Sequence, residues 1–571
     1  MTLRRSFPFL IVGAIVAALF LGLQARDVTS GAADYQQLRK LEEAYAFITR
    51  NYVEDVDSAR LVEAAIAGML AELDPHSTYI NAEEMRRVRE SFDATFDGVG
   101  IYYEFVDGPG DADTLAVLMP IAGGPSEEAG VLAGDRIVAI DDSSAVGISN
   151  EEVQRRLRGP RGTQVSMTIR RPGFPGTLRF AVTRDEIPLE TVVAAHMMDE
   201  QTGYIKLQRF ARTSHDEFMT ALRDLQGQGM QRLVFDLRDN AGGLMDQAVR
   251  IADEFLPSGR MIVYTDSRHA NFNREYRSRS GGAFETQPVI VLVNENSASA
   301  SEIVAGALQD HDRGLLVGRR TFGKGLVQQQ FGLTDGSVLQ MTISRYYTPS
   351  GRLIQTPYER GTDAEAYYTV KFELQAETRA RLAALGRQGV IEASDLAEIE
   401  SVPDSLRYRT TRGRVVFGGG GVMPDYLVPV DTLAAPLRTT ISRNLDNEFA
   451  RVYLDRLGEG FRGQWTGRQQ DFVRNYRLSD QAFSDFLDFA ATQGVTVVEQ
   501  APEDAEAAES VFVRSQLQAQ RAAVETRIRA YMARRLYGIE AFYPVVQQVD
   551  ETLLSAMRLW EPANSLALAS R

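Results

Sequence analysis

Two short apolar runs limit what this chain can fold into more than any other feature. Residues 233–237 (LVFDL) and 289–293 (VIVLV) have the length and hydrophobicity typical of strands buried on both faces of a parallel sheet. Each run ends at a polar loop, after which apolar residues recur at helical spacing. These residues include Leu244, Val249, Ile251 and Phe255 after the first run, and Ile303, Val304, Ala307 and Leu308 after the second. The pattern predicts an α/β core in which two strand-loop-helix units open on one edge of one sheet.

The loop after the second run carries three serines, Ser297, Ser299 and Ser301, between the end of a strand and the start of a helix. Open α/β sheets place their active sites in this position. The unpaired N–H groups at the start of the helix would stabilise an oxyanion formed beside one of these serines. N-capping is the structural alternative, and it explains one serine of the three. The loop therefore predicts a nucleophile.

A lysine follows in an unusual setting. Only four of the 62 basic residues are lysines, namely Lys40, Lys206, Lys324 and Lys371, and Lys324 lies between two glycines. A buried ammonium can lose its proton, whereas a guanidinium cannot. Lowering a lysine pKa from about 10.4 to about 7.5 corresponds to roughly 4 kcal/mol of differential desolvation, which a dry pocket can supply. Lys324 is therefore a candidate general base, although Lys206 and Lys371 have no comparable setting.

Three motifs together resemble a known family. The run SASASEIVAGAL, the lysine in TFGKG and a glutamine four residues later resemble the carboxy-terminal processing proteases, the tail-specific serine peptidases of family S41. The resemblance extends over roughly residues 30–430. It implies that Ser299 is the nucleophile, that Lys324, 25 residues later, is its base, and that Gln328 holds the lysine. It also implies a mixed α/β and α+β fold: a PDZ domain plus a ClpP/crotonase-like protease core with flanking helical regions.

The loop after the first apolar run matches a second motif of that family. Residues 236–243 read DLRDNAGG, and the family's D-L-R-x-N-x-G-G motif gives a backbone amide to the oxyanion hole. The resemblance thus pairs Gly242 or Gly243 with Ala300. A tight turn would explain the two glycines equally well.

Residues 96–187 alternate short strands with glycine turns, and FDGVGIYYEF together with AGVLAGDRIVAID resembles a PDZ domain. Such a domain binds a peptide as an added strand and holds its terminal carboxylate among backbone amides. The predicted carboxylate loop consists of Gly98, Val99, Gly100 and Ile101, whose glycines could also serve a plain turn. Arg158, in LRGPRG, resembles the arginine that links PDZ position to the active-site glutamine in some members. A helix-terminal cation is the alternative.

Two other kinds of active site are alternatives to the serine and lysine. The segment GRRTFGKG, residues 318–325, approaches a phosphate-binding P-loop, but Gly325 stands where that loop needs a hydroxyl for magnesium. A Ser-His-Asp triad could use His311, which lies near the serines in sequence. Its polar context, QDHDRG, favours a solvated cation at a helix end.

The amino terminus predicts export. Arg4 and Arg5 precede an uncharged apolar run over residues 7–23, so cleavage after Ala25 and retention as a membrane anchor are both open. The expected location is extracytoplasmic, in a bacterial periplasm or on the outer face of the inner membrane.

The predicted domains are a signal peptide or anchor (1–25), a helical region (26–95), a PDZ domain (96–187), a protease core (188–360), an insertion absent from shorter members (361–420), and the end of the core with carboxy-terminal helices (421–571).

Two apolar stripes at helical spacing and one histidine have structural interpretations. The first stripe predicts packing helices and consists of Leu38, Leu41, Tyr45, Ile48 and Tyr52. The second stripe predicts core packing or dimerisation, so a homo-oligomer is one of the alternatives, and it consists of Leu517, Val524, Ile528, Tyr531 and Met532. His76, in LDPHSTYI, is expected to be structural.

Composition excludes several kinds of partner and binding site. The net charge of −15 argues against a nucleic-acid partner, and the lack of cysteine excludes disulfides and thiolate metal sites. No HExxH or other metal spacing occurs, so neither a metal nor a cofactor is expected. The predicted protein is an exported serine endopeptidase that selects substrates by a free, apolar carboxyl terminus. The alternative is a catalytically silent PDZ scaffold that binds exported peptides.

Overall fold

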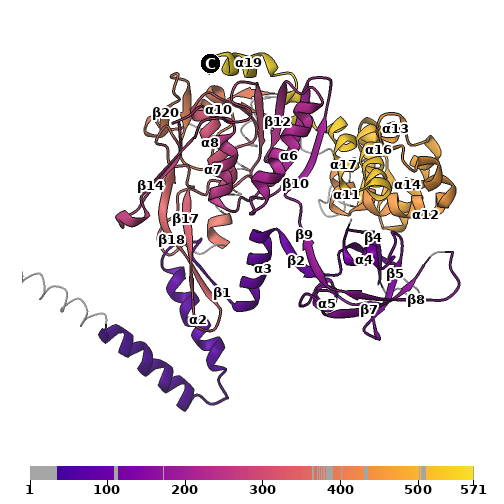
Figure 1. Cartoon of the computed structure of the whole chain (residues 1–571), viewed down its shortest axis with the longest axis horizontal. Coiled ribbons are helices and arrows are strands. Elements are labelled where there is room, and N and C mark those ends of the chain that lie inside the picture. Colours follow the sequence, from indigo (N-terminus) through magenta and orange to yellow (C-terminus); the bar gives the residue numbers. More distant parts are fainter. Residues whose placement is uncertain are drawn as a thin grey trace, which may run out of the picture.

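The computed structural model describes residues 35–569 apart from 108–112, 122, 172, 363–364, 370, 372, 374–375, 377–379, 381–389, 400–401, 430–434, 501 and 503–509. Figure 1 shows a central α/β core, a smaller β domain joined to it by two strands, and a helical domain formed by the carboxy-terminal part of the chain. Residues 1–25, including the apolar run predicted as signal or anchor, lie outside the described residues.

The core is built on a seven-stranded sheet with the order β10-β11-β12-β15-β16-β22-β19. Four neighbouring strands are parallel: β11 (Thr202–Leu207), β12 (Arg232–Asp236), β15 (Val289–Val293) and β16 (Leu315–Gly318). The edges are formed by β10 (Val192–Met197), β22 (Tyr426–Leu427) and β19 (Ile391–Glu392). Every residue of β15 is buried. The two apolar runs are therefore adjacent parallel strands, as predicted.

Helices cover both faces of this sheet. The side chains of Phe235 and Val291 pack with α6 (Ser214–Gly227), α7 (Met245–Asp253) and α8 (Ala300–Asp310). On the opposite face, Val234 and Ile290 pack with α18 (Glu551–Ala556) and α19 (Trp560–Ala569). The last helices of the chain thus complete the core of a sheet that begins more than 300 residues earlier.

A second sheet carries the segment after Lys324. The strands β17 (Leu326–Gly332) and β18 (Val338–Tyr347) form the predicted hairpin, and Gln328 lies on β17. The other strands are β1 (Thr78–Ile80), β13 (Met261–Asp266) and β14 (Arg274–Arg277). Because β1 pairs with β18, the segment around His76 reaches the hairpin that carries Gln328.

The β domain is a six-stranded sheet with β3 at one edge. Its elements are β3 (Ile101–Asp107), β4 (Asp113–Pro120), α4 (Pro125–Glu128), β5 (Arg136–Ile140), β6 (Ser143–Ser144), α5 (Asn150–Leu157), β7 (Gln164–Arg170) and β8 (Leu178–Thr183). The pairing of β2 (Thr95–Gly98) with β9 (Asp185–Pro188) joins the domain to the core. An edge strand such as β3 leaves backbone groups available for an added peptide strand.

The helical domain has its own hydrophobic core. It contains α11 (Ala435–Ser442), α12 (Leu445–Trp465), α13 (Gln469–Asn475), α14 (Asp480–Thr492), β23 (Thr496–Val498), β24 (Val511–Val513), α16 (Arg514–Tyr537) and α17 (Ile539–Val546). Leu517, Val524, Ile528 and Met532 of the second predicted stripe are buried in this core. Packing within the chain therefore accounts for these four residues.

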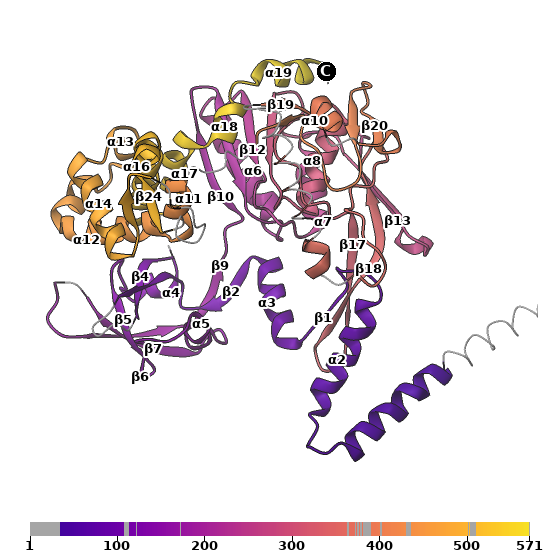
Figure 2. The ribbon, with the colours of Figure 1, turned by 180° about the vertical axis from the view of Figure 1, so that it is seen from behind.

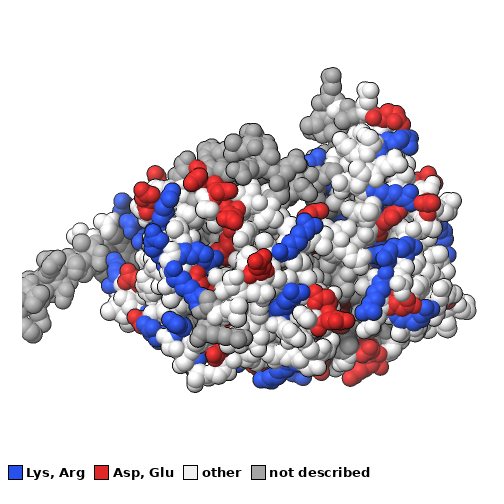
Figure 3. Space-filling model, turned by 90° about the horizontal axis from the view of Figure 1, so that it is seen from above, with Lys and Arg blue, Asp and Glu red and all other residues white. Residues whose placement is uncertain are grey.

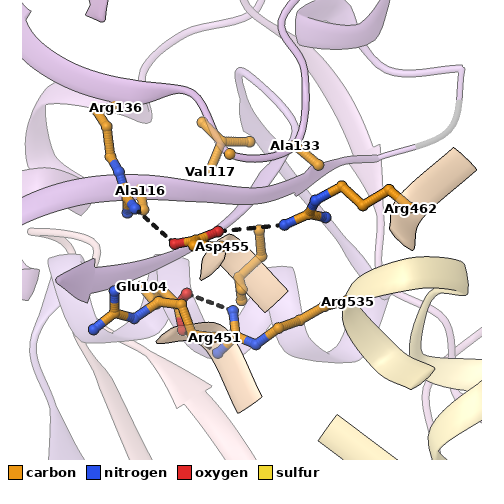
Figure 4. Close-up of a pocket in the computed structure, with 11 residues that line it drawn as sticks. Glu104, Ala116, Val117, Ala133, Arg136, Arg451, Asp455, Arg462 and Arg535 are labelled. Atoms are coloured by element: carbon orange, nitrogen blue, oxygen red, sulfur yellow. Dashed lines mark hydrogen bonds and ion pairs between the residues drawn. The ribbon is translucent and has the colours of Figure 1, made fainter. Parts of the chain in front are cut away.

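Ion pairs join the helical domain to its two neighbours. Arg535 on α16 donates to both carboxylate oxygens of Glu104 on β3, at 2.5 and 2.7 Å. Figure 4 shows Arg136 of the β domain and Arg462 of α12 directed at Asp455 in the same interface. Toward the core, Arg238 donates to Asp550 at 2.7 and 3.0 Å, and α17 lies beside β10 in Figures 1 and 2. The domain therefore connects the β domain to the core.

The amino-terminal helices extend from the body. Residues 35–51 are helical and are followed by α2 (Ser58–Ala71) and α3 (Ala82–Asp93). The prediction that Leu38, Leu41, Tyr45, Ile48 and Tyr52 pack within the chain is wrong: all five are 37 to 61% exposed. The reason is that this helix projects away from the core in Figure 1. None of the helices in the described ranges combines the length and apolarity that crossing a membrane requires.

The predicted insertion adds several short elements. Residues 365–369 are helical, and they are followed by β19, α10 (Ala393–Ile399), β20 (Arg407–Arg409) and β21 (Val415–Phe417). The strand β19 pairs with β22 at the edge of the core sheet.

On the face shown in Figure 3, basic and acidic side chains are interspersed instead of being gathered into one basic surface.

Candidate active site

Ser299 lies at the turn between β15 and α8 and has a strained backbone, with φ 54° and ψ −109°. Few non-glycine residues adopt a positive φ, and such strain persists only when its surroundings hold it. Its N–H donates to Glu302 at 2.8 Å, and its carbonyl accepts from the Tyr346 hydroxyl at 3.1 Å. These contacts fix the turn that carries the predicted nucleophile.

The flanking serines are structural. The Ser297 hydroxyl donates to the Leu237 carbonyl at 2.8 Å, and the Ser301 hydroxyl donates to the Asn240 carbonyl at 2.9 Å. Both side chains are fully buried, whereas Ser299 is half-buried. Of the three serines, Ser299 is the one that a substrate can reach.

The glycine loop after β12 lies directly against Ser299. A Cβ on Gly242 would come within 2.8 Å of the Ser299 Cβ, and one on Gly243 would come within 2.1 Å of the Phe210 carbonyl oxygen. The N–H of Gly242 donates to the Asn240 side chain at 2.9 Å. Within the described ranges, the N–H groups of Gly243 and Ala300 donate to no other group. Of the two glycines proposed for the oxyanion hole, Gly243 is thus the one with an available amide.

Lys324 is held by the predicted glutamine. Its Nζ donates to Gln328 Oε1 at 2.7 Å, and Gln328 Nε2 donates to the His76 carbonyl. Burial lowers the pKa of Lys324, while the negative charges of Glu302 and Asp74 oppose that shift. The arrangement suits a lysine that must give up its proton.

Glu302 connects the turn that carries Ser299 to the loop that carries Lys324. One carboxylate oxygen accepts from Thr321 Oγ1 at 2.5 Å and the Gly323 N–H at 2.7 Å; the other accepts from the Ser299 and Lys324 N–H groups at 2.8 and 2.9 Å. Burial raises the pKa of Glu302 to about 7 in spite of these bonds. Glu302 is not among the predicted site residues, although Ser299-x-x-Glu302 has the spacing of a capping box.

Three further supporting residues were not predicted to act at the site. Tyr346 donates to the Lys324 carbonyl at 2.5 Å as well as to that of Ser299. Gln355 Oε1 accepts from the Gly325 N–H at 2.8 Å. Burial, and secondly the charge of Lys324, lower the pKa of His76 to about 4, so its ring is neutral near pH 7. The sequence around these residues does not indicate their contacts with the site, because each residue reaches it from a different element.

The histidine alternative does not fit the geometry. His311 caps the opposite end of α8 from Ser299, and a helix of 11 residues is about 16 Å long. Its Nε2 lies 2.6 Å from the Met261 carbonyl oxygen, which requires a donor. The expectation of a solvated cation is also wrong, since burial lowers the pKa of His311.

The P-loop alternative and a metal site find no support in the geometry. The Gly323 and Lys324 N–H groups, which a P-loop would turn toward phosphate, already donate to Glu302. In the described ranges, no three histidine or acidic side chains are grouped to hold a metal ion.

The predicted carboxylate loop lies beside the edge strand β3. Gly100 has φ 72°, and the N–H groups of Val99 and Gly100 donate to no other group of the described chain.

Arg158 donates to Glu90 on α3 at 2.8 Å, and its guanidinium lies 4.6 Å from the Phe96 ring centroid. The structure therefore brings Arg158 to α3 rather than to Gln328.

Comparisons with known proteins agree with this architecture. Family models match residues 201–363 (peptidase family S41), 117–171 (PDZ domain) and 22–84 (activating protease CtpB N-terminal domain). The carboxy-terminal-processing protease of Bartonella bacilliformis is 36% identical over 357 residues, which cover 62% of this chain and 80% of the relative. The chain belongs to peptidase family S41.

Two further similar proteins are a second curated relative and a solved structure. The carboxy-terminal processing protease CtpA of Bacillus subtilis is 33% identical over 357 residues, covering 62% of this chain and 75% of the relative. The solved photosystem II D1 C-terminal processing protease is 32% identical and covers 55% of this chain and 89% of its own, with a TM-score of 0.31. Like the other S41 members, the protein is a serine peptidase, and the β domain is a PDZ domain. The predicted family, mixed fold and enzyme class are confirmed.

Proposed function

We propose that this S41 peptidase is an exported endopeptidase that cleaves proteins recognised by their carboxyl-terminal tail, with Ser299, Lys324 and Gln328 as its catalytic residues. The observation that carries the proposal is the pairing of a desolvated lysine with Gln328 next to a strained serine turn. Glu302 supports both parts through the Ser299 and Lys324 N–H groups.

The mechanism is an acyl transfer in two steps. Neutral Lys324 takes the Ser299 hydroxyl proton as Oγ attacks the peptide carbonyl, and the oxyanion accepts from the N–H groups of Gly243 and Ala300. The resulting ammonium then gives that proton to the leaving amine, so that an acyl-enzyme remains. A water molecule loses a proton to Lys324 and attacks the ester. As the bond to Ser299 Oγ breaks, the ammonium returns this proton to Oγ, and the new carboxyl terminus is released. Gln328 keeps the amine oriented throughout.

The PDZ domain supplies tail recognition in this proposal. The free amides of Val99 and Gly100 suit a terminal carboxylate, and the open edge of β3 suits the strand that leads to it. An apolar last residue is expected because Val99 and Ile101 belong to the hydrophobic core of the domain.

Tail recognition has a direct test. We expect the purified enzyme to cleave a protein with a free, apolar carboxyl terminus and to lose at least tenfold in kcat/KM when that terminus is amidated, because the carboxylate-binding amides lose their partner. A serine-directed fluorophosphonate should label Ser299, as mapped by mass spectrometry. Peptide binding without hydrolysis or labelling would instead support the scaffold alternative.

Export and assembly complete the proposal. Residues 1–25 direct the chain out of the cytoplasm, to the periplasm or the outer face of the inner membrane, either as a cleaved signal or through the anchor over residues 7–23. The exposed stripe on residues 35–51 supports a homo-oligomer, since an apolar face of that extent is commonly covered by a partner.

We also propose that Arg158 couples the PDZ domain to the catalytic site, through α3. Arg158 pairs with Glu90 on α3, and α3 directly follows β1, the strand paired with the hairpin of Gln328. We expect Arg158→Ala to lower kcat about tenfold for every substrate, including a short peptide without a PDZ-binding tail. Glu90→Ala should have the same effect, and the double variant should lose no more than either single one. An unchanged kcat on the short peptide would leave Arg158 with a docking role only.

A further inference from the structure

The segment after the matched peptidase region reaches the active site. Tyr367 and Lys371 are buried, and both lie beyond residue 363, where the S41 match ends. Gln355 Nε2 donates to the Tyr367 hydroxyl at 3.2 Å, and the Tyr367 ring lies 5.0 Å from that of His76. The Lys371 ammonium lies 3.0 Å from the centroid of the Phe322 ring. The segment therefore packs on the loop that carries Lys324.

Phe322 belongs to the part of that loop which Glu302 holds. Its neighbours Thr321 and Gly323 donate to one oxygen of Glu302, while Ser299 and Lys324 donate to the other. Four donors face this carboxyl group. A proton on the oxygen bound by Ser299 and Lys324 would face only N–H groups, and a proton on the other oxygen would require the Thr321 hydroxyl to turn and accept it. Hydrogen bonds to an ionised acceptor are stronger than bonds to a neutral one, so the Ser299 and Lys324 backbones are held most firmly when Glu302 is ionised.

Burial works against that ionisation. It raises the pKa of Glu302 to about 7, so losing a nearby positive charge would leave the carboxyl group mostly protonated near neutral pH. Lys324 is one such cation, but it must be neutral to act as a base. Lys371 supplies a second positive charge that attracts Glu302.

The other groups around Lys371 do not replace it. Burial lowers the pKa of Lys371 to about 8, and the charges of Glu302 and Glu295 oppose this shift. Glu295 is paired with Arg319 at 2.5 Å. His76 is neutral near pH 7, and burial raises the pKa of Tyr367 to about 12, so its phenol is neutral as well. Tyr368, also in contact with Phe322, completes this aromatic surrounding.

We propose that Lys371 is a positioning residue of the catalytic loop: seated on Phe322, its ammonium keeps Glu302 ionised while Lys324 is neutral, and so holds the Ser299 and Lys324 backbones in place. The proposal rests on the serine-lysine chemistry proposed above. It assigns a role to a residue outside the region that the peptidase model matches.

The first test is the pH dependence of hydrolysis. Lys371→Met removes the charge at similar length, so the pKa of Glu302 should rise, because its ionised form loses an attraction. We expect kcat at pH 7 to fall about fivefold, KM to change little, and the acidic limb of the kcat profile to move about one pH unit higher, with recovery at alkaline pH. Lys371→Arg should stay within about threefold of wild type, and Lys40→Met, at an exposed lysine, should match wild type. An equal loss for Lys371→Met at every pH would indicate packing alone and overturn the proposal.

The second test does not depend on hydrolysis. The protonated carboxyl absorption of Glu302 can be followed by infrared titration in the Ser299→Ala background and assigned by its disappearance in Glu302→Gln. We expect the midpoint to rise by about one pH unit with Lys371→Met and to stay in place with Lys371→Arg. An unshifted midpoint overturns the proposal even if the enzyme is active. A shifted midpoint in a wild-type chain without peptidase activity would instead reject the proposed function.

Discussion

Ser299→Ala should abolish peptide hydrolysis, with kcat/KM falling roughly 10⁴- to 10⁶-fold, because no other hydroxyl can form the acyl-enzyme. The turn should survive, since the Ser299 N–H and carbonyl make its contacts with Glu302 and Tyr346. Steady-state kinetics together with circular dichroism would separate loss of chemistry from loss of fold. Binding of a tail peptide to the PDZ domain should remain at the wild-type level.

The neighbouring serines provide matched controls. Ser297→Ala and Ser301→Ala should each retain kcat/KM within about tenfold and yet destabilise the protein by about 1–3 kcal/mol in urea unfolding. The reason is that each leaves a buried carbonyl, of Leu237 or of Asn240, without its hydroxyl donor. If Ser297→Ala were as inactive as Ser299→Ala while still folded, the assignment of the nucleophile would be wrong.

Lys324→Arg should be as inactive as Lys324→Ala, despite keeping the charge and nearly the length of the side chain. A general base must be neutral before it takes a proton, and a guanidinium is never neutral in a protein. Burial lowers the pKa of Lys324, so activity should rise with pH as the ammonium is lost. We expect kcat to fall at least 10³-fold for both variants across pH 6 to 10. The measurement is a pH series of kcat for the two variants beside wild type.

His311→Ala is the control for Lys324, because it removes the base of the rival triad. Its position at the far end of α8, bound to the Met261 carbonyl, predicts wild-type kcat and some loss of stability. An active Lys324→Arg enzyme, or a loss of kcat in His311→Ala as large as that in Lys324→Ala, would favour the histidine triad instead.

Local patterns in the sequence were enough to predict the elements that hold the candidate site. The runs at 233–237 and 289–293 are continuous and apolar because both faces of their strands are covered. A strand covered on both faces needs apolar residues at consecutive positions, so it can be predicted from a short stretch of sequence. The loop after each strand could be located because a helical period begins directly behind it. The serine, lysine and glutamine spacing lies within about 30 residues, so a single stretch of chain sufficed to propose the site.

Contacts between distant segments were decided by the tertiary structure. The choice of Gly243 over Gly242 depends on which amide Asn240 occupies, and the role of His76 depends on the pairing of β1 with β18. The exposure of the amino-terminal stripe shows that periodicity predicts an apolar face but not what covers it. The surroundings of Glu302 and Lys371 could not be predicted, because burial and charge at one point come from elements as distant in the chain as His76 and Lys371. The sequence by itself determined which residues could react, and the packing of remote segments decided which charges and amides surround them.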